Sequence, residues 1–437
     1  PVFNQRLRAE SIAALQCVDY VVINEWPTAT ETIKILKPDV YCKGSDYANG
    51  EDDLTREIYN EEMAVKSMGG RIHFTDEITF SSSSLLNAYF SVYPKEAENF
   101  LKRFQKNYSS DQIIQKLKAL KKMKVLVISD TIIDEYHYCQ PLGKPPKGVT
   151  ISAKYLQEEK FVGGGLAASN HIAGFCDDVH LVTCLGRQND YEGFILSHLK
   201  PNIKPKFFSR DDAPTVVKRR FVQPFFLFKM FEVCYLNDRE LPESLNQEIC
   251  EFLKLNIPNY DLVLVADFGH GFIGKEMVNI ICDMSKFLAI NAQTNSANAG
   301  FNLITKYPRA DYICVDEPEI RLACHNKEGK LEDLMLDISR RLQCNKISIT
   351  RGNLDTITYS PEEGFCYIPI FSNKVVDTIG AGDAFLSVTS PCVAAGYPMD
   401  MVGFIGNAVG ALKVQIVGNR DSVEPVPLFK FVTALLK

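Results

Sequence analysis

The sequence predicts an α/β protein made of two successive systems of alternating strands and helices. Short apolar runs bounded by turn residues alternate with segments whose apolar residues recur at helical spacing. Short strands that alternate with helices in this way imply parallel βα units. The length of 437 residues allows two or three domains.

The first system covers residues 1–92, and its alternating strands and helices imply parallel βα units. Residues 93–121 are charged and helical in period with a break at Ser109–Ser110, so we expect a connector of two helices. The elements expected in the first system are helices at 7–15, 29–36, 57–68 and 83–92 and strands at 19–23, 39–42 and 71–75.

The second system covers residues 122–437 and is too long for a single mononucleotide-binding half. Two further segments, near 135–161 and 213–236, are predicted to form a small extra sheet that stands off the main one. Pro224 divides the second of these segments into two strands. The strands expected in the main sheet lie near 124–129, 179–183, 261–266, 287–291, 311–315 and 346–350.

The composition is that of an ordinary globular protein, with 46% apolar and 23% charged residues. The net charge of −6 argues against a nucleic-acid partner or an acidic membrane surface, although a local cluster could still bind a small anion. The 13 cysteines form no C-x-x-C pair, which favours reduced thiols and a cytoplasmic location. The apolar stretch 384–417 is broken by Pro391, Pro398 and Asp400, so we expect buried helix and no membrane span. The chain starts with Pro1 at the approach to a helix, which suggests a fragment.

Residues 267–276, "DFGHGFIGKE", partly match two glycine-rich nucleotide-binding motifs, the P-loop and the dinucleotide-binding motif, but satisfy neither. A P-loop requires Ser or Thr after its lysine, and Glu276 stands there. A dinucleotide-binding fold requires an acidic residue about 20 positions further on, and Asp283 is too close.

Residues 375–385, "VVDTIGAGDAF", place Gly380, Ala381 and Gly382 where a helix begins. Glycine allows successive N–H groups to point into one concavity, and the helix start adds partial positive charge, so the turn suits a phosphoryl group. Asp383 in the first helical turn would then act as a general base. A helix start in which Asp383 only favours the helix dipole explains the same residues.

The motif "VVDTIGAGDAF" resembles the C-terminal signature of the ribokinase-like (PfkB) carbohydrate kinases. Segments that resemble other parts of this family follow in order through residues 122–437, namely "KVLVISDTIIDEY", "FVGGGLAASNHIAGF", "PTVVKRRFV", "VDEPEI" and "SITRG". The resemblance implies a central, mostly parallel sheet with helices on both faces and a small β-sheet lid.

The resemblance also implies transfer of the γ-phosphoryl group of ATP to a hydroxyl of a sugar or sugar phosphate, with Mg²⁺ as cofactor. Asp383 would be the base, and Gly380, Ala381 and Gly382 would form the anion hole. The remaining roles that it implies are substrate binding for Asp134, Gly163, Gly164, Asn170, Lys218 and Arg220, nucleotide binding for Thr350, Gly352 and Asn407, and the metal site for Asp316 and Glu319.

Three of these assignments have weaker support in the residues. The family's Gly-Gly-x-x-Asn pattern lacks its Asn, because Asn170 comes a helical turn late. Asp316 stands where the family has Asn, although both are oxygen ligands. The basic residues of the predicted lid strand, Lys218 and Arg220, fit a solvated strand face as well as a substrate contact.

The first system, with the segments "LKPDVYCKGSDY", "MGGRIHF" and "FSSSSLLN", resembles the latter part of a nucleotidyltransferase module. The resemblance implies a partial Rossmann-like domain over residues 1–92. In that family Lys43, Ser82 and Ser83 match positions that contact nucleotide phosphates, but the catalytic H-x-G-H motif does not occur in this chain. The pairing of modules resembles the bifunctional heptose 7-phosphate kinase and heptose 1-phosphate adenylyltransferase, with the order reversed. A bifunctional enzyme in a longer chain and a non-catalytic sugar- or nucleotide-binding subunit are the alternative functions.

The aromatic residues of the predicted lid strands suggest a homodimer. Phe221, Phe225, Phe226, Phe228 and Phe231 would pack against a partner's lid, because exposed aromatic strands are usually covered.

Overall fold

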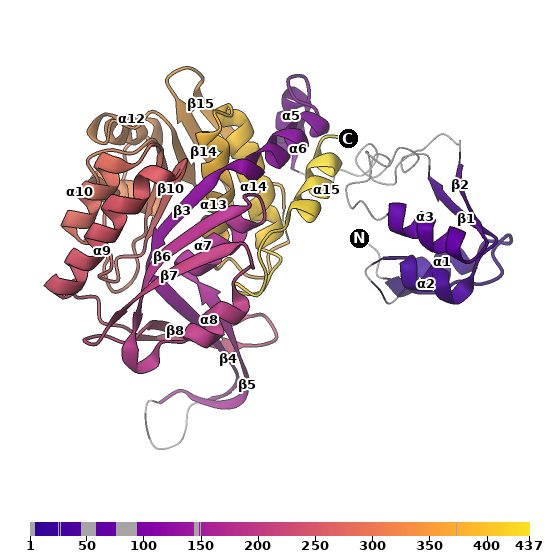
Figure 1. The fold of residues 1–437 in the computed structure, drawn as a ribbon, viewed down its shortest axis with the longest axis horizontal. Coiled ribbons are helices and arrows are strands. Elements are labelled where there is room, and N and C mark those ends of the chain that lie inside the picture. Colours follow the sequence, from indigo (N-terminus) through magenta and orange to yellow (C-terminus); the bar gives the residue numbers. More distant parts are fainter. Residues whose placement is uncertain are drawn as a thin grey trace. The chain divides into compact units, whose positions relative to one another are not determined.

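The computed structural model describes residues 5–24, 26, 28–44, 58–75, 94–143, 148, 150–372 and 374–437. Contacts divide the chain into two compact units, Pro1–Phe90 and Ser91–Lys437. The elements are labelled in Figure 1.

The described residues of the smaller unit form a parallel pair of strands and three helices. In the pair, Val40 lies opposite Arg71. The segment 19–23, predicted as a strand, is not one: it pairs with no neighbour among the described residues, and Tyr20 is 92% exposed. An apolar run that finds neither a strand partner nor a covering helix has nothing to hold it extended. The predicted helix at 83–92 lies outside the described residues. The elements are α1 (Gln5–Ala13), α2 (Thr30–Leu36), β1 (Val40–Gly44), α3 (Ile58–Ser67) and β2 (Arg71–Thr75).

The larger unit is built on a nine-stranded sheet with the strand order β15-β14-β13-β12-β11-β10-β3-β6-β7. The strands from β13 to β7 are parallel, and β14 and β15 add an antiparallel edge. The interior strand β10 reads "LVLVAD" and is buried along its whole length, as parallel strands with helices on both faces are. The strands are β3 (Lys124–Ser129), β6 (Asp178–Gly186), β7 (Ile203–Arg210), β10 (Leu262–Asp267), β11 (Leu288–Ala292), β12 (Tyr312–Asp316), β13 (Ile347–Thr350), β14 (Asp355–Ser360) and β15 (Gly364–Pro369).

Helices cover both faces of this sheet. Figure 1 shows α7, α13 and α14 on one side of the sheet and α9, α10 and α12 on the other. Gly406 allows α14 to approach α13 closely, because a Cβ there would lie 2.2 Å from the ring of Phe385. The helices are α5 (Lys95–Phe104), α6 (Ser110–Ala119), α7 (Gly164–Ala173), α8 (Glu192–His198), α9 (Glu243–Asn256), α10 (Lys275–Met284), α11 (Glu317–Ala323), α12 (Leu331–Arg341), α13 (Ala381–Ala394), α14 (Met399–Lys413) and α15 (Pro425–Leu435).

A second sheet of four strands, the lid, extends from the main sheet. Its strands are β4 (Thr131–Gly143), β5 (Ser152–Gly163), β8 (Val216–Gln223) and β9 (Phe228–Tyr235), in the order β5-β4-β8-β9. β4 begins two residues after β3 ends, and β5 leads directly into α7. The lid therefore rises from the edge of the main sheet where the parallel strands end, which is the edge at which ligands of such folds bind.

Residues 93–121 do not form a separate connector, because α5 and α6 belong to the larger unit. The ring of Phe104 stacks on that of Phe404 in α14, with 4.5 Å between the ring centroids. Ser109 and Gln112 form a reciprocal capping box that starts α6 at the predicted break. The apolar faces of both helices are buried on the larger unit.

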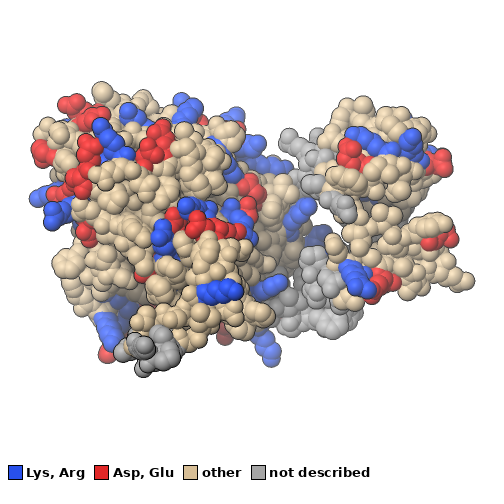
Figure 2. Space-filling model, turned by 90° about the horizontal axis from the view of Figure 1, so that it is seen from below, with Lys and Arg blue, Asp and Glu red and all other residues tan. Residues whose placement is uncertain are grey.

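The stretch 384–417 forms α13 and α14, which are almost wholly buried. Among the described residues, no helix is both long and apolar enough to cross a membrane. On the face of the molecule seen in Figure 2, basic and acidic side chains are interspersed and leave broad areas without charge.

Replacing Phe104 by Ala should destabilise the larger unit by about 3–5 kcal/mol, because the buried ring leaves a cavity between α5 and α14. Denaturant unfolding of the whole chain measures this. Phe225→Ala, at a lid position that is 85% exposed, is the matched control and should change stability by less than about 0.5 kcal/mol. Equal stability of the two variants would contradict the packing described.

Candidate active site

Helix α13 begins at a turn whose N–H groups are largely open. Gly380 has φ +75°, a left-handed conformation that glycine adopts without strain. Ala381 donates its N–H to the carbonyl oxygen of Thr378 at 3.3 Å. Among the described residues, no group accepts the N–H of Gly380, Gly382 or Asp383. Open donors at a helix start form a site for an anion.

The carboxylate of Asp383 lies in the first turn of α13 and is buried. Its Oδ1 accepts a hydrogen bond of 2.6 Å from Nε2 of Gln293, which follows β11. Burial raises the pKa of Asp383 to about 6, the hydrogen bond from Gln293 opposes that rise, and the Asp134 carboxylate adds to it. An ionised carboxylate with a pKa close to neutrality is a suitable general base.

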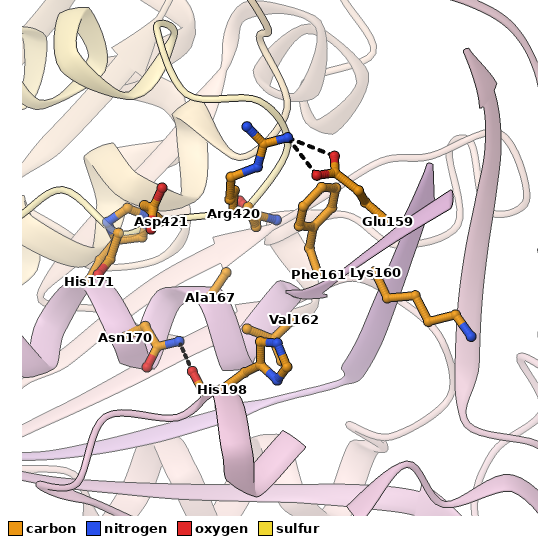
Figure 3. A pocket seen from close by; sticks show the side chains of 12 residues that line it. Glu159, Lys160, Phe161, Val162, Ala167, Asn170, His171, His198, Arg420 and Asp421 are labelled. Carbon is orange, nitrogen blue, oxygen red and sulfur yellow. Dashed lines mark hydrogen bonds and ion pairs between the residues drawn. The ribbon is translucent and has the colours of Figure 1, made fainter. Parts of the chain in front are cut away.

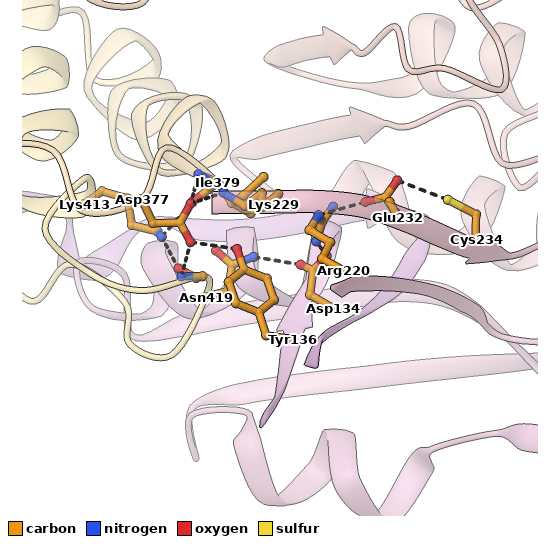
Figure 4. Close-up of polar contacts among 11 residues, drawn as sticks. Asp134, Tyr136, Arg220, Lys229, Glu232, Cys234, Asp377, Ile379, Lys413 and Asn419 are labelled. Atoms are coloured by element: carbon orange, nitrogen blue, oxygen red, sulfur yellow. Dashed lines mark hydrogen bonds and ion pairs between the residues drawn. The ribbon is translucent and has the colours of Figure 1, made fainter. Parts of the chain in front are cut away.

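The turn is held by Asp377, the first aspartate of the motif (Figure 4). Its Oδ1 accepts hydrogen bonds from Lys229 Nζ at 2.6 Å and Ile379 N at 3.1 Å. Its Oδ2 accepts from the Tyr136 hydroxyl at 2.7 Å and Gly418 N at 2.8 Å. Burial alone would raise the pKa of Asp377, but these four donors outweigh it and hold the pKa below its usual value. Asp377 is therefore an anionic anchor between the lid and the turn.

Asp134 on β4 lies at the centre of a second polar group (Figure 4). Its Oδ1 pairs with Arg220, whose Nε lies 2.8 Å from Glu232. Its Oδ2 accepts a hydrogen bond of 3.2 Å from Asn419 Nδ2. Burial opposes the charge of Arg220, but the two carboxylates hold the pKa of its guanidinium above its usual value. Arg220 therefore orients Asp134 and is itself held by Glu232.

Two glycines allow other groups to approach this region. A Cβ on Gly163 would lie 2.3 Å from Asp134 Oδ2, and a Cβ on Gly380 would lie 2.3 Å from Asn419 Oδ1. Asn419 Oδ1 is itself buried and has no hydrogen-bond partner among the described residues. Asn419 therefore lies between Asp134 and the anion-binding turn, and it retains an acceptor for a ligand hydroxyl.

Gly164 and Asn170 have different surroundings. Gly164 has φ +53° and starts α7 against the carbonyl of Asp130, from which a Cβ would lie 3.2 Å. Asn170 donates to His198 O at 2.9 Å and accepts from Lys200 N at 3.0 Å. It lines a pocket of about 320 Å³ that Asn419 also lines (Figure 3). The structure brings Gly163 to Asp134 but uses the Asn170 amide to fix the end of α8.

Lys218 is the available cation of the acceptor side. It pairs in register with Asp134 across β4 and β8, and its Nζ lies 6.0 Å from the ring centroid of Phe268. Among the described residues, Lys218 forms no ion pair with a carboxylate. Its charge is one of those that restrain the pKa of Asp383, which places it near the base.

A pocket of about 540 Å³ lies on the other side of the turn, and its size suits a nucleotide. The residues that line it include Thr350, Gly352, Phe371, Ala381, Gly382 and Asn407.

The polar atoms of Asn407 are all occupied within the protein. Its Nδ2 donates to Ile368 O at 2.8 Å and Pro369 O at 2.9 Å, and its Oδ1 accepts from the Thr356 hydroxyl at 2.6 Å. Asn407 therefore shapes the pocket by fixing the end of β15. Its amide is already hydrogen-bonded within the protein and does not offer a ligand a free polar atom.

Asp316 and Glu319 form a reciprocal capping box at the start of α11. Asp316 Oδ1 accepts from Glu319 N at 2.8 Å, and Glu319 Oε2 accepts from Asp316 N at 2.9 Å. Burial and the neighbouring Asp316 carboxylate raise the pKa of Glu319 to about 7. The capping box by itself is therefore a reason for an acidic residue at both Asp316 and Glu319, even without a bound metal.

The surroundings of this box nevertheless fit Mg²⁺. Asn291 Oδ1 and Thr294 Oγ1 are buried and have no partner among the described residues, and Thr294 N donates to Glu319. No group of three or more His, Cys, Asp or Glu side chains in the described part of the chain could hold a metal ion. Mg²⁺ is usually bound by one or two carboxylates together with waters and substrate phosphates.

In the smaller unit, Lys43 at the end of β1 pairs with the buried Glu61, with 2.7 Å between Nζ and Oε2. Ser82 and Ser83 lie outside the described residues. The predicted phosphate contacts of this unit therefore rest on Lys43, whose ammonium is already neutralised by a carboxylate.

Four residues of the site were not assigned a role from the sequence: Gln293, Asp377, Lys413 and Asn419. Asp377 lies inside the motif "VVDTIGAGDAF", so the motif pointed to this part of the chain. Gln293 lies in a polar segment directly after the strand predicted at 287–291. Lys413 is the last residue of α14 and Asn419 lies in the loop after it. Neither belongs to a local pattern, and only the folded chain brings them to the turn.

The comparison with family models gives one match, to the pfkB family carbohydrate kinases over residues 122–425. The curated relatives include the bifunctional protein HldE of Campylobacter jejuni, 23% identical over 320 residues, and that of Shewanella, 23% identical over 323 residues. Both alignments cover 71% of this chain and 65% of the relative. The match therefore spans less than two thirds of the length of these relatives.

Solved structures share the fold. Phosphofructokinase-2 from Escherichia coli in complex with substrates and products aligns with a TM-score of 0.58 at 11% identity, covering 72% of this chain and all of that one. Arabidopsis thaliana ribokinase complexed with ribose and ATP aligns with a TM-score of 0.54 at 15% identity, covering 71% of this chain and 99% of that one. The larger unit accordingly has the ribokinase-like fold.

Proposed function

This chain belongs to the pfkB family of carbohydrate kinases, and from that premise we propose that it transfers the γ-phosphoryl group of ATP to a hydroxyl of a sugar phosphate. The observation that carries this proposal is the start of α13. There a buried carboxylate, Asp383, lies beside open N–H groups, between a nucleotide-sized pocket and the Asp134 cluster.

The acceptor hydroxyl is held on the lid side of the turn. Asp134 accepts hydrogen bonds from the sugar hydroxyls, while Arg220 and Asn419 keep its carboxylate in place. Asp383 takes the proton of the attacking hydroxyl as the new P–O bond forms. The bond from the γ-phosphorus to the bridging oxygen of ADP breaks in the same displacement. The N–H groups of Gly380 and Gly382 stabilise the negative charge on the oxygens of the transferring group.

ATP occupies the pocket beside Thr350, Gly352 and Phe371, with its phosphates toward Ala381 and Gly382. Asp316, Glu319 and the unpartnered oxygens of Asn291 and Thr294 are the residues that would hold Mg²⁺ together with its waters. When bound, Mg²⁺ neutralises charge on the phosphates.

A phosphorylated acceptor is favoured by the free charge of Lys218. The lid places this ammonium beside Asp134 without a carboxylate partner in the described part of the chain, so it can pair with an anionic group on the sugar. The resemblance to the heptose kinases and the similarity to proteins named bifunctional protein HldE support a heptose 7-phosphate as acceptor, in a pathway that makes nucleotide-activated sugars.

Asp383→Asn should abolish phosphoryl transfer, because an amide cannot take the hydroxyl proton. The expected loss of kcat is about 10²- to 10⁴-fold, with little change in ATP affinity. ADP release on a panel of sugar phosphates measures the first, and calorimetric titration with ATP measures the second.

Asp400→Asn is the matched control. This carboxylate lies in the first turn of α14 and accepts a hydrogen bond from the Tyr108 hydroxyl, and it is not part of the turn before α13. Turnover by Asp383→Asn at the rate of this control would remove Asp383 as the base.

The pH dependence of turnover should show an acidic limb near pH 6, because the base must be ionised and burial raises its pKa to about 6. Gln293→Leu removes a hydrogen bond that favours the ionised form, so the limb should move to higher pH. Activity of this variant should be depressed most at pH 6 and approach that of the unaltered chain at pH 8. A limb that stays in place or moves to lower pH would show that Gln293 does not tune the base. Rates measured from pH 5 to pH 9 decide between these results.

The lid supports the proposal of a homodimer. Phe225, Phe226, Phe228 and Phe231 are 44–85% exposed. In the described residues β9 pairs with β8 on one side and forms the edge of the four-stranded sheet on the other. Sedimentation equilibrium at micromolar concentration should give twice the chain mass, and Phe226→Glu together with Phe228→Glu should halve it. A monomer for the unaltered chain would exclude this assembly.

A further inference from the structure

Lys413, the last residue of α14, has its ammonium group buried behind the anion-binding turn. The residue has no exposed surface, and its Nζ donates to Ile379 O at 2.9 Å and to Gly418 O at 2.5 Å. A lysine is almost never fully buried unless its charge is matched, because desolvation of an ammonium group is costly. The position thus requires an explanation beyond packing.

The carbonyl group of Ile379 belongs to the same peptide unit as the N–H of Gly380. A trans peptide is planar, and its C=O and N–H bonds point in opposite directions. No peptide bond among the described residues is cis. By holding the Ile379 oxygen on one side, Lys413 directs the open N–H of Gly380 to the other side. A charged donor on the carbonyl oxygen also polarises the peptide and strengthens its N–H as a donor.

Lys413 and Asp377 both hydrogen-bond to the two loops that contain Ile379 and Gly418, Lys413 as a donor and Asp377 as an acceptor. Asp377 accepts the N–H groups of Ile379 and Gly418, whereas Lys413 donates to the C=O groups of the same two residues (Figure 4). The loop that contains Gly418 also carries Asn419, which bonds Asp134. The two side chains thereby set the distance between the anion-binding turn and the acceptor cluster.

We propose that Lys413 is a positioning residue for phosphoryl transfer. Its ammonium group orients the peptide between Ile379 and Gly380 toward the transferring group, and it places a fixed positive charge behind the Gly380 N–H. This inference rests on the proposed kinase function and adds a residue that touches neither substrate. Its contribution is largest where charge develops during transfer, so it acts on kcat more than on ATP binding.

Lys413→Met tests this role, because methionine fills a similar volume and donates no hydrogen bond. The expected result is a fall in kcat of about 10- to 100-fold with an unchanged KM for ATP, the size typical of residues that orient a reacting group. A second readout is independent of turnover: fluoroaluminate is a planar anion that mimics the transferring phosphoryl group. It should tighten ADP binding to the unaltered chain and do so much less in the variant.

Lys200→Met is the matched control. Lys200 pairs with Glu424 at 2.6 Å and so also tethers the C-terminal region, without contact to the turn. This control should retain both kcat and the fluoroaluminate effect. A Lys413→Met variant that equals the control in both readouts would overturn the inference. If Lys413→Met does not fold, Lys413→Gln takes its place, and unaltered kcat in that neutral variant would overturn the inference as well.

The unaltered chain separates the two claims. If it neither turns over any acceptor nor binds fluoroaluminate with ADP, the proposed function fails. If it does both and the Lys413 variants do too, only the role of Lys413 fails.

Discussion

The candidate site depends on the convergence of four donors on one buried carboxylate, that of Asp377. Lys229 and Tyr136 come from the lid, Ile379 from the turn before α13, and Gly418 from the loop after α14. A buried carboxylate is stable only when its charge is met by such donors. Each of the three segments is consequently fixed by the other two, and no one of them forms the site alone.

This arrangement distributes charge in a way that the whole-chain net charge of −6 does not reveal. Arg220, Lys229 and Lys413 are each committed to a carboxylate or to backbone carbonyls. Lys218 is left to face a ligand from the lid, and the open N–H groups face one from the turn. An anion entering between them meets positive charge that the protein has already oriented, so little reorganisation is needed during transfer.

Much of the larger unit could be predicted from sequence, because its central strands are continuous apolar runs and its lid strands are divided at Pro224. The antiparallel strands β14 and β15 and the edge strand β7 were not foreseen, since their residues are mixed in polarity and they become strands only by pairing at the sheet edges. The apolar run at 19–23 was predicted as a strand and has no partner in the described residues.

Some residues of the site could likewise be predicted from the sequence, and others could not. Gly380, Gly382 and Asp383 lie in one short motif, whose local chemistry indicates an anion site before any folding is considered. Asn419 and Lys413 act through contacts to residues far away in the sequence, as Asn419 does with Asp134. Asn170 and Asn407 illustrate the converse: both lie beside pockets, yet their amides are occupied by backbone groups that no pattern in the sequence reveals.

The central claim is that this chain moves a phosphoryl group from ATP to a sugar. Phosphorus NMR of the chain with Mg-ATP and a panel of sugars and sugar phosphates, heptose 7-phosphates included, tests it most directly. One acceptor should give a new phosphoester signal that grows in step with ADP. Binding of ATP without a new ester on any member of the panel would contradict the account and favour a non-catalytic binding protein.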